Sequence, residues 1–200
     1  IVTLHLLGGM GLLALLAVQS EVVTPRPLVL RPALRCGVQA VAALVLLQIA
    51  LGGWVSTNYA VLACTDFPTC QGRWWPDMDF THGFTLWRDL GETSGGSYLP
   101  FAALTAIHYA HRLAAYVVLA AMVWLAWALH RAPDAKRWAR MLALLAAWQL
   151  LSGLSNVVLG WPLLAALAHT AGAAALVIVL ALLLTRTQSQ ARVVVAPTPV

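Results

Sequence analysis

The sequence predicts an all-α integral membrane protein, built as a bundle of transmembrane helices. Of its 200 residues, 61% are hydrophobic and only 10% charged, and its mean hydropathy of +0.81 lies far outside the soluble range. Five apolar stretches are long enough to cross a bilayer as helices. They cover residues 1–19, 36–56, 102–129, 139–159 and 162–185. Because the chain starts at Ile1, inside the first stretch and with no secretory signal before it, we interpret it as a fragment.

The positive charges predict how the helices are oriented. They occupy the first connection, the third connection and the C-terminal tail, which the positive-inside rule assigns to the cytoplasm. These residues are Arg26, Arg31 and Arg35, then Arg131, Lys136, Arg137 and Arg140, and finally Arg186 and Arg192. Residues 20–35 are then a cytoplasmic loop, 57–101 an external loop and 186–200 a cytoplasmic tail. The net charge of +5 is not gathered on a soluble domain, which argues against nucleic acid as a partner.

The external loop contains two cysteines separated by five residues, Cys64 and Cys70 in CTDFPTC. On the oxidising side of the membrane, a disulfide between them is the expected state. The alternative is a pair of unrelated free thiols. Cys36, at the cytoplasmic edge, is interpreted as a small apolar residue.

Aromatic residues follow the cysteines and alternate with charged ones. They are Trp74, Trp75, Phe80, Phe84 and Trp87. This pattern is typical of a segment that lies on the membrane interface, with its rings at headgroup level. Two interpretations stay open: a purely structural lid, and a lid that also covers a substrate cleft.

Six histidines are present, and four of them fall inside apolar helices. His82 and His130 lie in a loop and at a membrane boundary, where solvated roles are expected. Ionisable residues within membrane helices are costly, so the other four are functional candidates. These four are His5, His108, His111 and His169. For any one of them, a hydrogen bond across a helix interface is the alternative.

Two of these histidines are predicted to lie at the same depth in the membrane. His111 is 19 residues from His130, and His169 is 17 residues from Arg186. At about 1.5 Å per residue they lie roughly 28 Å and 26 Å from the cytoplasmic ends of their helices. An iron between two helices needs an imidazole from each side at matched height. The sequence therefore predicts a haem bound by His111 and His169.

The neighbours of His111 suggest further contacts with the same haem. His108 would lie about 33 Å up the same helix, roughly 7 Å above His169, too high to be the better iron ligand. It could hydrogen-bond a propionate or relay protons. Arg112 suits a propionate carboxylate through charge-assisted hydrogen bonds. Alternatively, Arg112 extends to the interface without binding haem.

Three segments together resemble the second half of the haem A synthase family. They are LQIALGGWVSTNYAVLACTDFPTCQGRWWPDMDFTHGFTLW, AIHYAHRLAA and SNVVLGWPLLAALAHTAGA, and the match runs from about Leu47 to Ala175. TLHLLGG near the start is similar to the last helix of the family's first half. Members have eight helices in two four-helix halves, and the resemblance makes residues 36–185 one complete haem-binding half. It assigns residues 1–19 to a truncated first half.

The resemblance also implies a reaction and a ligand set. The family oxidises the methyl group at C8 of haem O to a formyl group, which gives haem A, with a bis-histidine haem B as electron-transfer cofactor. Carried over by motif, His111 and His169 are the haem B ligands, and His5 matches one of two ligands of the substrate haem O in the first half. The Glu-x-x-His-Arg motif of the first half is not present in this sequence. At the equivalent place in the second half, His108 stands in the position of the Glu. The fragment is therefore expected to be incomplete for catalysis.

The resemblance implies a setting as well. It predicts a multi-pass protein of the bacterial inner membrane whose loop 57–101 is periplasmic. Besides haem O and lipid, expected partners are the farnesyltransferase that makes haem O, cytochrome oxidase assembly, and a second copy of the chain.

The alternative function is a cytochrome b-like electron carrier or quinone-linked subunit with the same histidine pair. A transporter is disfavoured by the lack of broken helices.

Overall fold

The computed structural model describes residues 2–89, 91–93 and 95–193, with side chains to residue 187. Within these residues five helices are long and apolar enough to cross a membrane. They are α1 (Val2–Val23), α2 (Pro32–Thr57), α4 (Phe101–His130), α5 (Lys136–Val158) and α6 (Leu163–Val193). No strand occurs among the described residues, so the predicted all-α membrane bundle is confirmed.

The helices extend beyond the predicted apolar stretches mainly at their basic ends. Helix α2 begins at Pro32, where proline is favoured because the first helical N–H needs no partner. Helix α5 begins at Lys136, directly after the short helix η2 (Pro133–Ala135). The turn into α6 uses two left-handed residues, Gly160 (φ 68°) and Trp161 (φ 62°).

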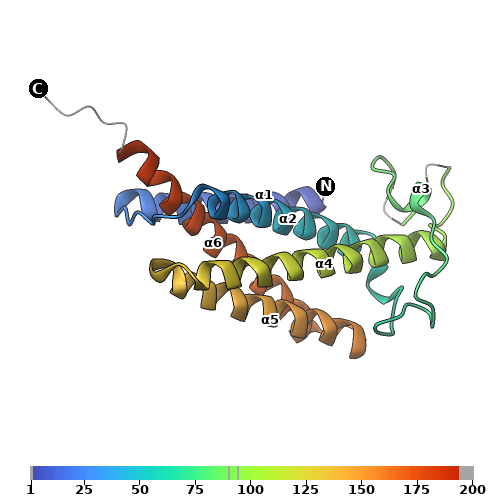
Figure 1. Ribbon diagram of the computed structural model, residues 1–200. Coiled ribbons are helices and arrows are strands. Elements are labelled where there is room, and N and C mark those ends of the chain that lie inside the picture. The colour runs from blue at the N-terminus through green and yellow to red at the C-terminus, as the bar shows by residue number, and fades with distance from the viewer. Residues whose placement is uncertain (1, 90, 94, 194–200) are drawn as a thin grey trace, which may run out of the picture.

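Four of the helices close into a ring. Helix α2 packs against α4, α4 against α5, α5 against α6, and α6 against α2 (Figure 1). Helix α1 lies against α6 and α2. Short connections make α4, α5 and α6 antiparallel neighbours, as in other helix bundles.

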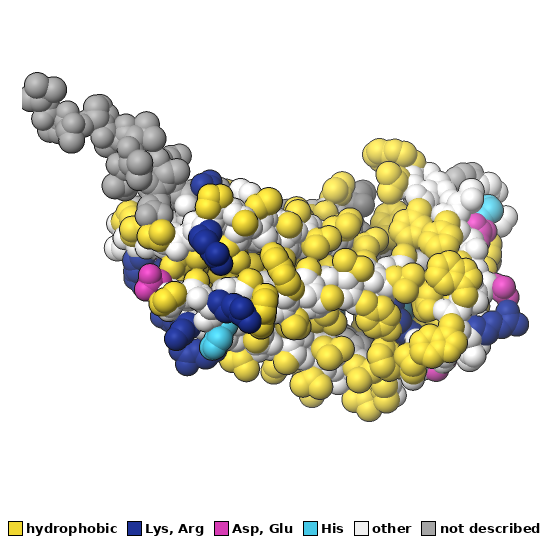
Figure 2. Space-filling model, viewed as in Figure 1, with side chains coloured by type: hydrophobic (Ala, Val, Ile, Leu, Met, Phe, Trp, Pro, Cys, Tyr) yellow, Lys and Arg dark blue, Asp and Glu magenta, His cyan; other side chains and the backbone are white. Residues whose placement is uncertain are grey.

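The closely packed core fills only one half of this ring. That half is at the basic end, defined here as the end where α4 turns into α5 and where Lys and Arg side chains gather (Figure 2). Its buried residues include Val38, Val41, Val45, Val118, Met122, Leu125, Leu129, Leu142, Leu180 and Leu183. They come from the start of α2 and α5 and from the end of α4 and α6. The opposite half of the ring encloses a cavity instead.

One buried ion pair fastens α1 to the ring at the basic end. Nη2 of Arg186 on α6 donates to Oε2 of Glu21 on α1 at 2.8 Å, and the Glu21 side chain is only 5% exposed. The Arg186 guanidinium also lies 5.0 Å above the ring of Trp138 on α5. Charge pairing and stacking suit arginine at such a partly buried site.

The long connection between α2 and α4 covers the other end of the ring, which we call the loop end. It contains the short helices η1 (Ala60–Leu62) and α3 (Phe80–Gly83) (Figure 1). Cys64 and Cys70 form the expected disulfide and are fully buried, whereas Cys36 is free and exposed. The indole of Trp54 donates to the carbonyl oxygen of Gly83 at 2.9 Å, which ties this connection to α2.

The aromatic residues of this connection divide into two groups. Trp74, Trp75 and Trp87 are 71%, 67% and 91% exposed. Phe84 is partly buried against the cluster around Val55. Large exposed rings at one end of an apolar bundle are what an interfacial segment requires.

Candidate functional site

A cavity of about 550 Å³ lies between the helices in the half of the ring nearest the loop end. Residues of all five long helices line it, and most of its wall is apolar. Its volume is in the usual range for cofactor sites. Four histidines reach it: His5 from α1, His108 and His111 from α4, and His169 from α6.

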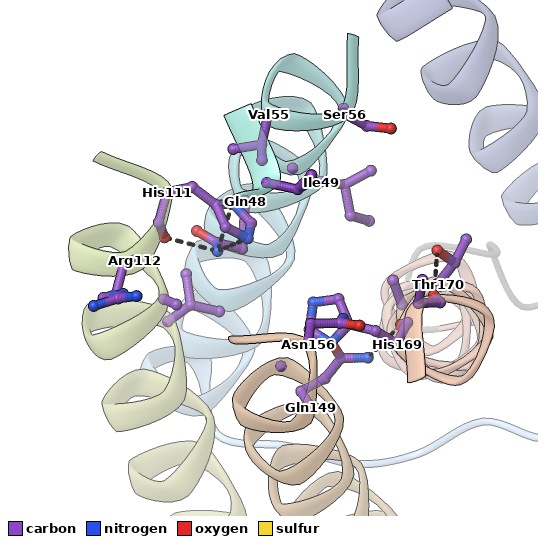
Figure 3. A pocket seen from close by; sticks show the side chains of 18 of the residues that line it. Gln48, Ile49, Val55, Ser56, His111, Arg112, Gln149, Asn156, His169 and Thr170 are labelled. Atoms are coloured by element: carbon purple, nitrogen blue, oxygen red, sulfur yellow. Dashed lines mark hydrogen bonds between the residues drawn. The ribbon is translucent and has the colours of Figure 1, made fainter. Parts of the chain in front are cut away.

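His111 is held from α2. The Gln48 side-chain amide nitrogen donates to the backbone oxygen of His111 at 3.0 Å, and it lies 3.0 Å from the ring nitrogen Nδ1 (Figure 3). One helical turn further along α2, Gly52 faces the same ring. A Cβ atom at position 52 would lie 3.1 Å from Cε1 of His111. The imidazole therefore occupies space that any other residue would partly fill.

His169 is held in a similar way from α5. The Gln149 amide nitrogen donates to the backbone oxygen of His169 at 3.1 Å. A Cβ atom at Gly153 would lie 3.2 Å from Cε1 of His169. In addition, Oγ of Ser152 lies 2.9 Å from Nδ1 of the ring.

The two histidines are thus supported by the same short pattern, Gln followed four residues later by Gly. It occurs as QIALG on α2 and as QLLSG on α5. Residues four apart lie on one face of a helix, so each helix presents an amide and an open space to the histidine beside it. Sequence reasoning did not single out Gln48, Gln149 or Ser152. The available signal was a polar residue within an apolar span at this repeated spacing.

His108 is linked to the connection between α2 and α4. Its Nδ1 donates to the carbonyl oxygen of Ala60 in η1 at 2.9 Å, and the residue is only 7% exposed. It lines the cavity on the side nearest the loop end. Its expected contact with a propionate stays a prediction.

Arg112 makes contacts that the sequence did not predict. Nη1 donates to the carbonyl oxygens of Asp66 and Thr69 at 3.0 Å and 2.7 Å, and Nη2 donates to that of Cys64 at 3.2 Å. The guanidinium also lies 5.9 Å from the ring of Phe67. Arg112 therefore holds the disulfide loop against α4, while it also lines the cavity. Its expected role towards a propionate stays a prediction.

The remaining histidines differ in setting. His5 is exposed on α1 and reaches the cavity wall. His130 is the exposed last residue of α4. His82 is also exposed. Its backbone N–H and its ring both hydrogen-bond the carboxylate of Asp79, and these two bonds, the backbone one more strongly, lower the pKa of the Asp79 carboxyl group. Both His82 and His130 thus lie on the surface, as expected.

The donor set of the cavity fits a haem. Two imidazoles come from different helices on opposite sides of one apolar space (Figure 3). Two glycines leave room for their rings. Imidazole pairs of this kind are common axial ligands of haem iron. Among the described residues, no group of three or more His, Cys, Asp and Glu side chains is placed to hold a bare metal ion.

Fold and cavity together define a multi-pass membrane protein with a histidine-lined site between its helices. Residues 1–181 match the model of a family described as "Cytochrome oxidase assembly protein". The chain belongs to this family, the haem A synthase family.

Two curated relatives are each named heme A synthase. The one from Shewanella oneidensis is 36% identical over 183 residues, which cover 88% of this chain and 54% of the relative. The one from Methylobacterium sp. (strain 4-46) is 35% identical over 127 residues, which cover 62% of this chain and 33% of the relative. The chain thus spans about half the length of the Shewanella relative. No solved structure matches it significantly.

Proposed function

We propose that the cavity holds a haem B whose iron is bound by His111 and His169. The observation that carries this proposal is that both imidazoles line one apolar cavity and that a glycine leaves room for each ring. When bound, this haem would supply one-electron transfer. The protein's own contribution is to fix the two ligands and to keep water away from them. Gln48 and Gln149 anchor the backbone of each ligand, and the apolar wall excludes solvent.

We further propose that the chain serves haem A synthesis, the conversion of the C8 methyl of haem O to a formyl group. The names of its two relatives support this assignment. The family resemblance suggests that His5 would be a ligand of the substrate haem, although His5 also lines the wall of the cavity that contains His111 and His169. Conversion of a methyl to a formyl group needs an oxygen atom as well as electron transfer, and a haem held by His111 and His169 would supply the electron transfer. The farnesyltransferase that makes haem O and the cytochrome oxidase that takes up haem A are the proposed neighbours in this sequence.

The proposed orientation places the basic end in the cytoplasm and the loop end in the periplasm of a bacterial inner membrane. Two observations support it. Lys and Arg side chains gather at the end where α4 meets α5 (Figure 2), as expected of cytoplasmic loops. The Cys64–Cys70 disulfide is at the other end, and disulfides persist in oxidising compartments.

Two measurements test the proposal. Protein purified in detergent should show the absorption spectrum of a low-spin, six-coordinate haem B, and a colourless protein would contradict the haem site. Pigment should also be extracted from membranes that contain haem O and a chimera in which this chain replaces the matching half of the Shewanella relative. A formyl haem in the extract supports haem A synthesis, whereas haem B alone favours a cytochrome b-like electron carrier. The chain by itself is expected to bind haem B and to form no haem A.

A further inference from the structure

The hydroxyl group of Ser152 connects α5 to the ring of His169. Its oxygen lies 2.7 Å from the carbonyl oxygen of Trp148 and 2.9 Å from Nδ1 of His169. A carbonyl oxygen only accepts hydrogen bonds, so the single hydroxyl proton of Ser152 points to Trp148. The hydroxyl lone pairs then face His169, and Nδ1 must carry the proton that they accept.

We propose that Ser152 is a positioning residue that fixes His169 as the Nδ1–H tautomer. A neutral imidazole with its proton on Nδ1 has its remaining lone pair on Nε2, the atom free to bind iron. Ser152 would thus select the nitrogen that binds and hold the ring angle. The inference deepens the haem proposal for His111 and His169 and rests on it.

His111 lacks an equivalent acceptor among the described residues. The hydrogen-bond partner of its Nδ1 is the Gln48 amide nitrogen, which is a donor, at 3.0 Å. The amide oxygen of Gln48 is buried and has no hydrogen-bond partner within the part of the chain that the structure describes. Turning the amide would bring that oxygen to Nδ1, but it would break the bond from the same amide to the His111 backbone oxygen. The two ligands are therefore inequivalent, and a hydroxyl group supports only His169.

This inequivalence has a measurable consequence for the iron. A hydrogen bond from the outer ring nitrogen to an acceptor makes the imidazole a stronger donor to the metal. A stronger donor favours the ferric state. Without the Ser152 hydroxyl, the bond from His169 to iron should weaken and the reduction potential of the haem should rise. Loss of such an outer contact typically lowers metal affinity by about 10- to 100-fold.

The chain offers a matched control on the same helix. Ser155 donates to the carbonyl oxygen of Leu151 at 2.8 Å, the same contact to the preceding turn that Ser152 makes with Trp148. Among the described residues its hydroxyl group hydrogen-bonds that carbonyl oxygen alone and makes no bond to His169. If Ser152 acts only on its own helix, removal of either hydroxyl group should have the same effect.

The experiment compares Ser152→Ala, Ser152→Thr and Ser155→Ala in the haem-loaded chain purified in detergent. Three properties are measured: the rate of haem transfer to an apo-globin, the reduction potential, and the electron paramagnetic resonance of the ferric low-spin haem. Ser152→Ala should release haem at least about tenfold faster. It should also raise the potential and shift the resonance. Ser152→Thr, which keeps the hydroxyl group, and Ser155→Ala should resemble the unsubstituted chain.

Two outcomes would overturn the inference. One is a Ser152→Ala protein indistinguishable from Ser155→Ala, and the other is a Ser152→Thr protein shifted as far as Ser152→Ala. His169→Ala separates these outcomes from failure of the haem proposal. If His169→Ala loses the low-spin spectrum while Ser152→Ala behaves as Ser155→Ala, the ligand assignment stands and the role of Ser152 is wrong. If His169→Ala keeps the spectrum, the ligand assignment is wrong and the role of Ser152 falls with it.

Discussion

Gly52 on α2 faces the imidazole of His111 on α4 so closely that a Cβ atom at position 52 would lie 3.1 Å from ring atom Cε1. Gly153 on α5 has the same relation to His169 on α6, at 3.2 Å. Small residues often let membrane helices approach one another, but these two make room for side chains. Each proposed ligand therefore depends on the helix beside it as well as on its own.

We expect Gly52→Ala and Gly153→Ala to weaken haem binding. The added methyl group would push the neighbouring ring by a few tenths of an ångström. We expect the affinity for haem to fall by about tenfold, which is the lower end of the effect of changing a residue that supports a metal ligand. Haem titration of the apoprotein measures it. Gly53→Ala is the control, because a Cβ there would be equally crowded, at 3.1 Å, but against Leu6 and Thr3 of α1. Equal losses in all three variants would contradict the account.

Removal of Glu21 should destabilise the protein strongly. Its carboxylate is buried and paired with Arg186 at 2.8 Å, so Glu21→Gln leaves a partly buried guanidinium without its counter-charge. Breaking a buried pair in this way typically costs about 3 kcal/mol. Thermal unfolding in detergent checks the loss.

The exposed pair Arg73–Asp77 provides the comparison. Its side chains are 64% and 88% exposed, and such pairs contribute less than about 1 kcal/mol. Arg73→Ala should therefore unfold almost as the unsubstituted chain does. Similar losses of stability for Glu21→Gln and Arg73→Ala would show that the ion pair of Glu21 does not stabilise the packing of α1 against α6.

Asp66 should make the disulfide loop sensitive to acid. The hydroxyl of Thr69 and the backbone N–H groups of Gly72 and Gln71 donate to its carboxylate and lower its pKa from 3.8 to about 2. A carboxyl group whose pKa is depressed on folding stabilises the fold above its unfolded pKa and loses that effect as the pH falls. The stabilisation is thus complete above about pH 4 and lost through about pH 2.

Unfolding measured from pH 6 to pH 2 tests this effect. Asp66→Asn should be less stable at neutral pH and should lose the extra decline below about pH 4, because its amide does not titrate in this range. If the stability of the unsubstituted chain and that of Asp66→Asn decline in parallel over that range, the role of Asp66 is contradicted.

The disulfide gives a test of orientation. In intact cells, an impermeant thiol reagent should label neither Cys64 nor Cys70 before reduction and both after it. Cys36, free and at the opposite end of the bundle, should react only once the cells are opened. Cys36 labelled in intact cells would reverse the proposed orientation.

Replacing both Cys64 and Cys70 by Ser should lower the free energy of unfolding by about 2 kcal/mol, because the disulfide closes a small loop.

The sequence predicted the five helices well because the length of an apolar run reports directly on a membrane span. It also predicted the disulfide, since Cys64 and Cys70 are close in sequence. It did not predict which face of each helix points inwards. Lipid-facing and buried positions are both apolar here, so no amphipathic stripe marks the interior. The polar residues Gln48 and Ser152 stand out within their apolar spans, but their contacts with His111 and His169 depend on helix rotation, which the sequence does not give.

The contacts of Arg112 were missed for a related reason. The sequence places this residue beside His111, which suggested a role at the haem. The structure shows that its guanidinium also reaches three carbonyl oxygens of a loop more than 40 residues away in sequence. Backbone acceptors are present in every loop, so residue types carry no signal of such a contact.

The central claim, that His111 and His169 bind one haem B, is tested most directly by the visible spectrum of three variants. His111→Ala and His169→Ala should each abolish the low-spin, six-coordinate spectrum, because both imidazoles are needed for it. His108→Ala should shift the spectrum without removing it, since His108 lies three residues nearer the loop end of α4 than His111 and is therefore not level with His169. A low-spin haem retained in His111→Ala but lost in His108→Ala would contradict the ligand assignment.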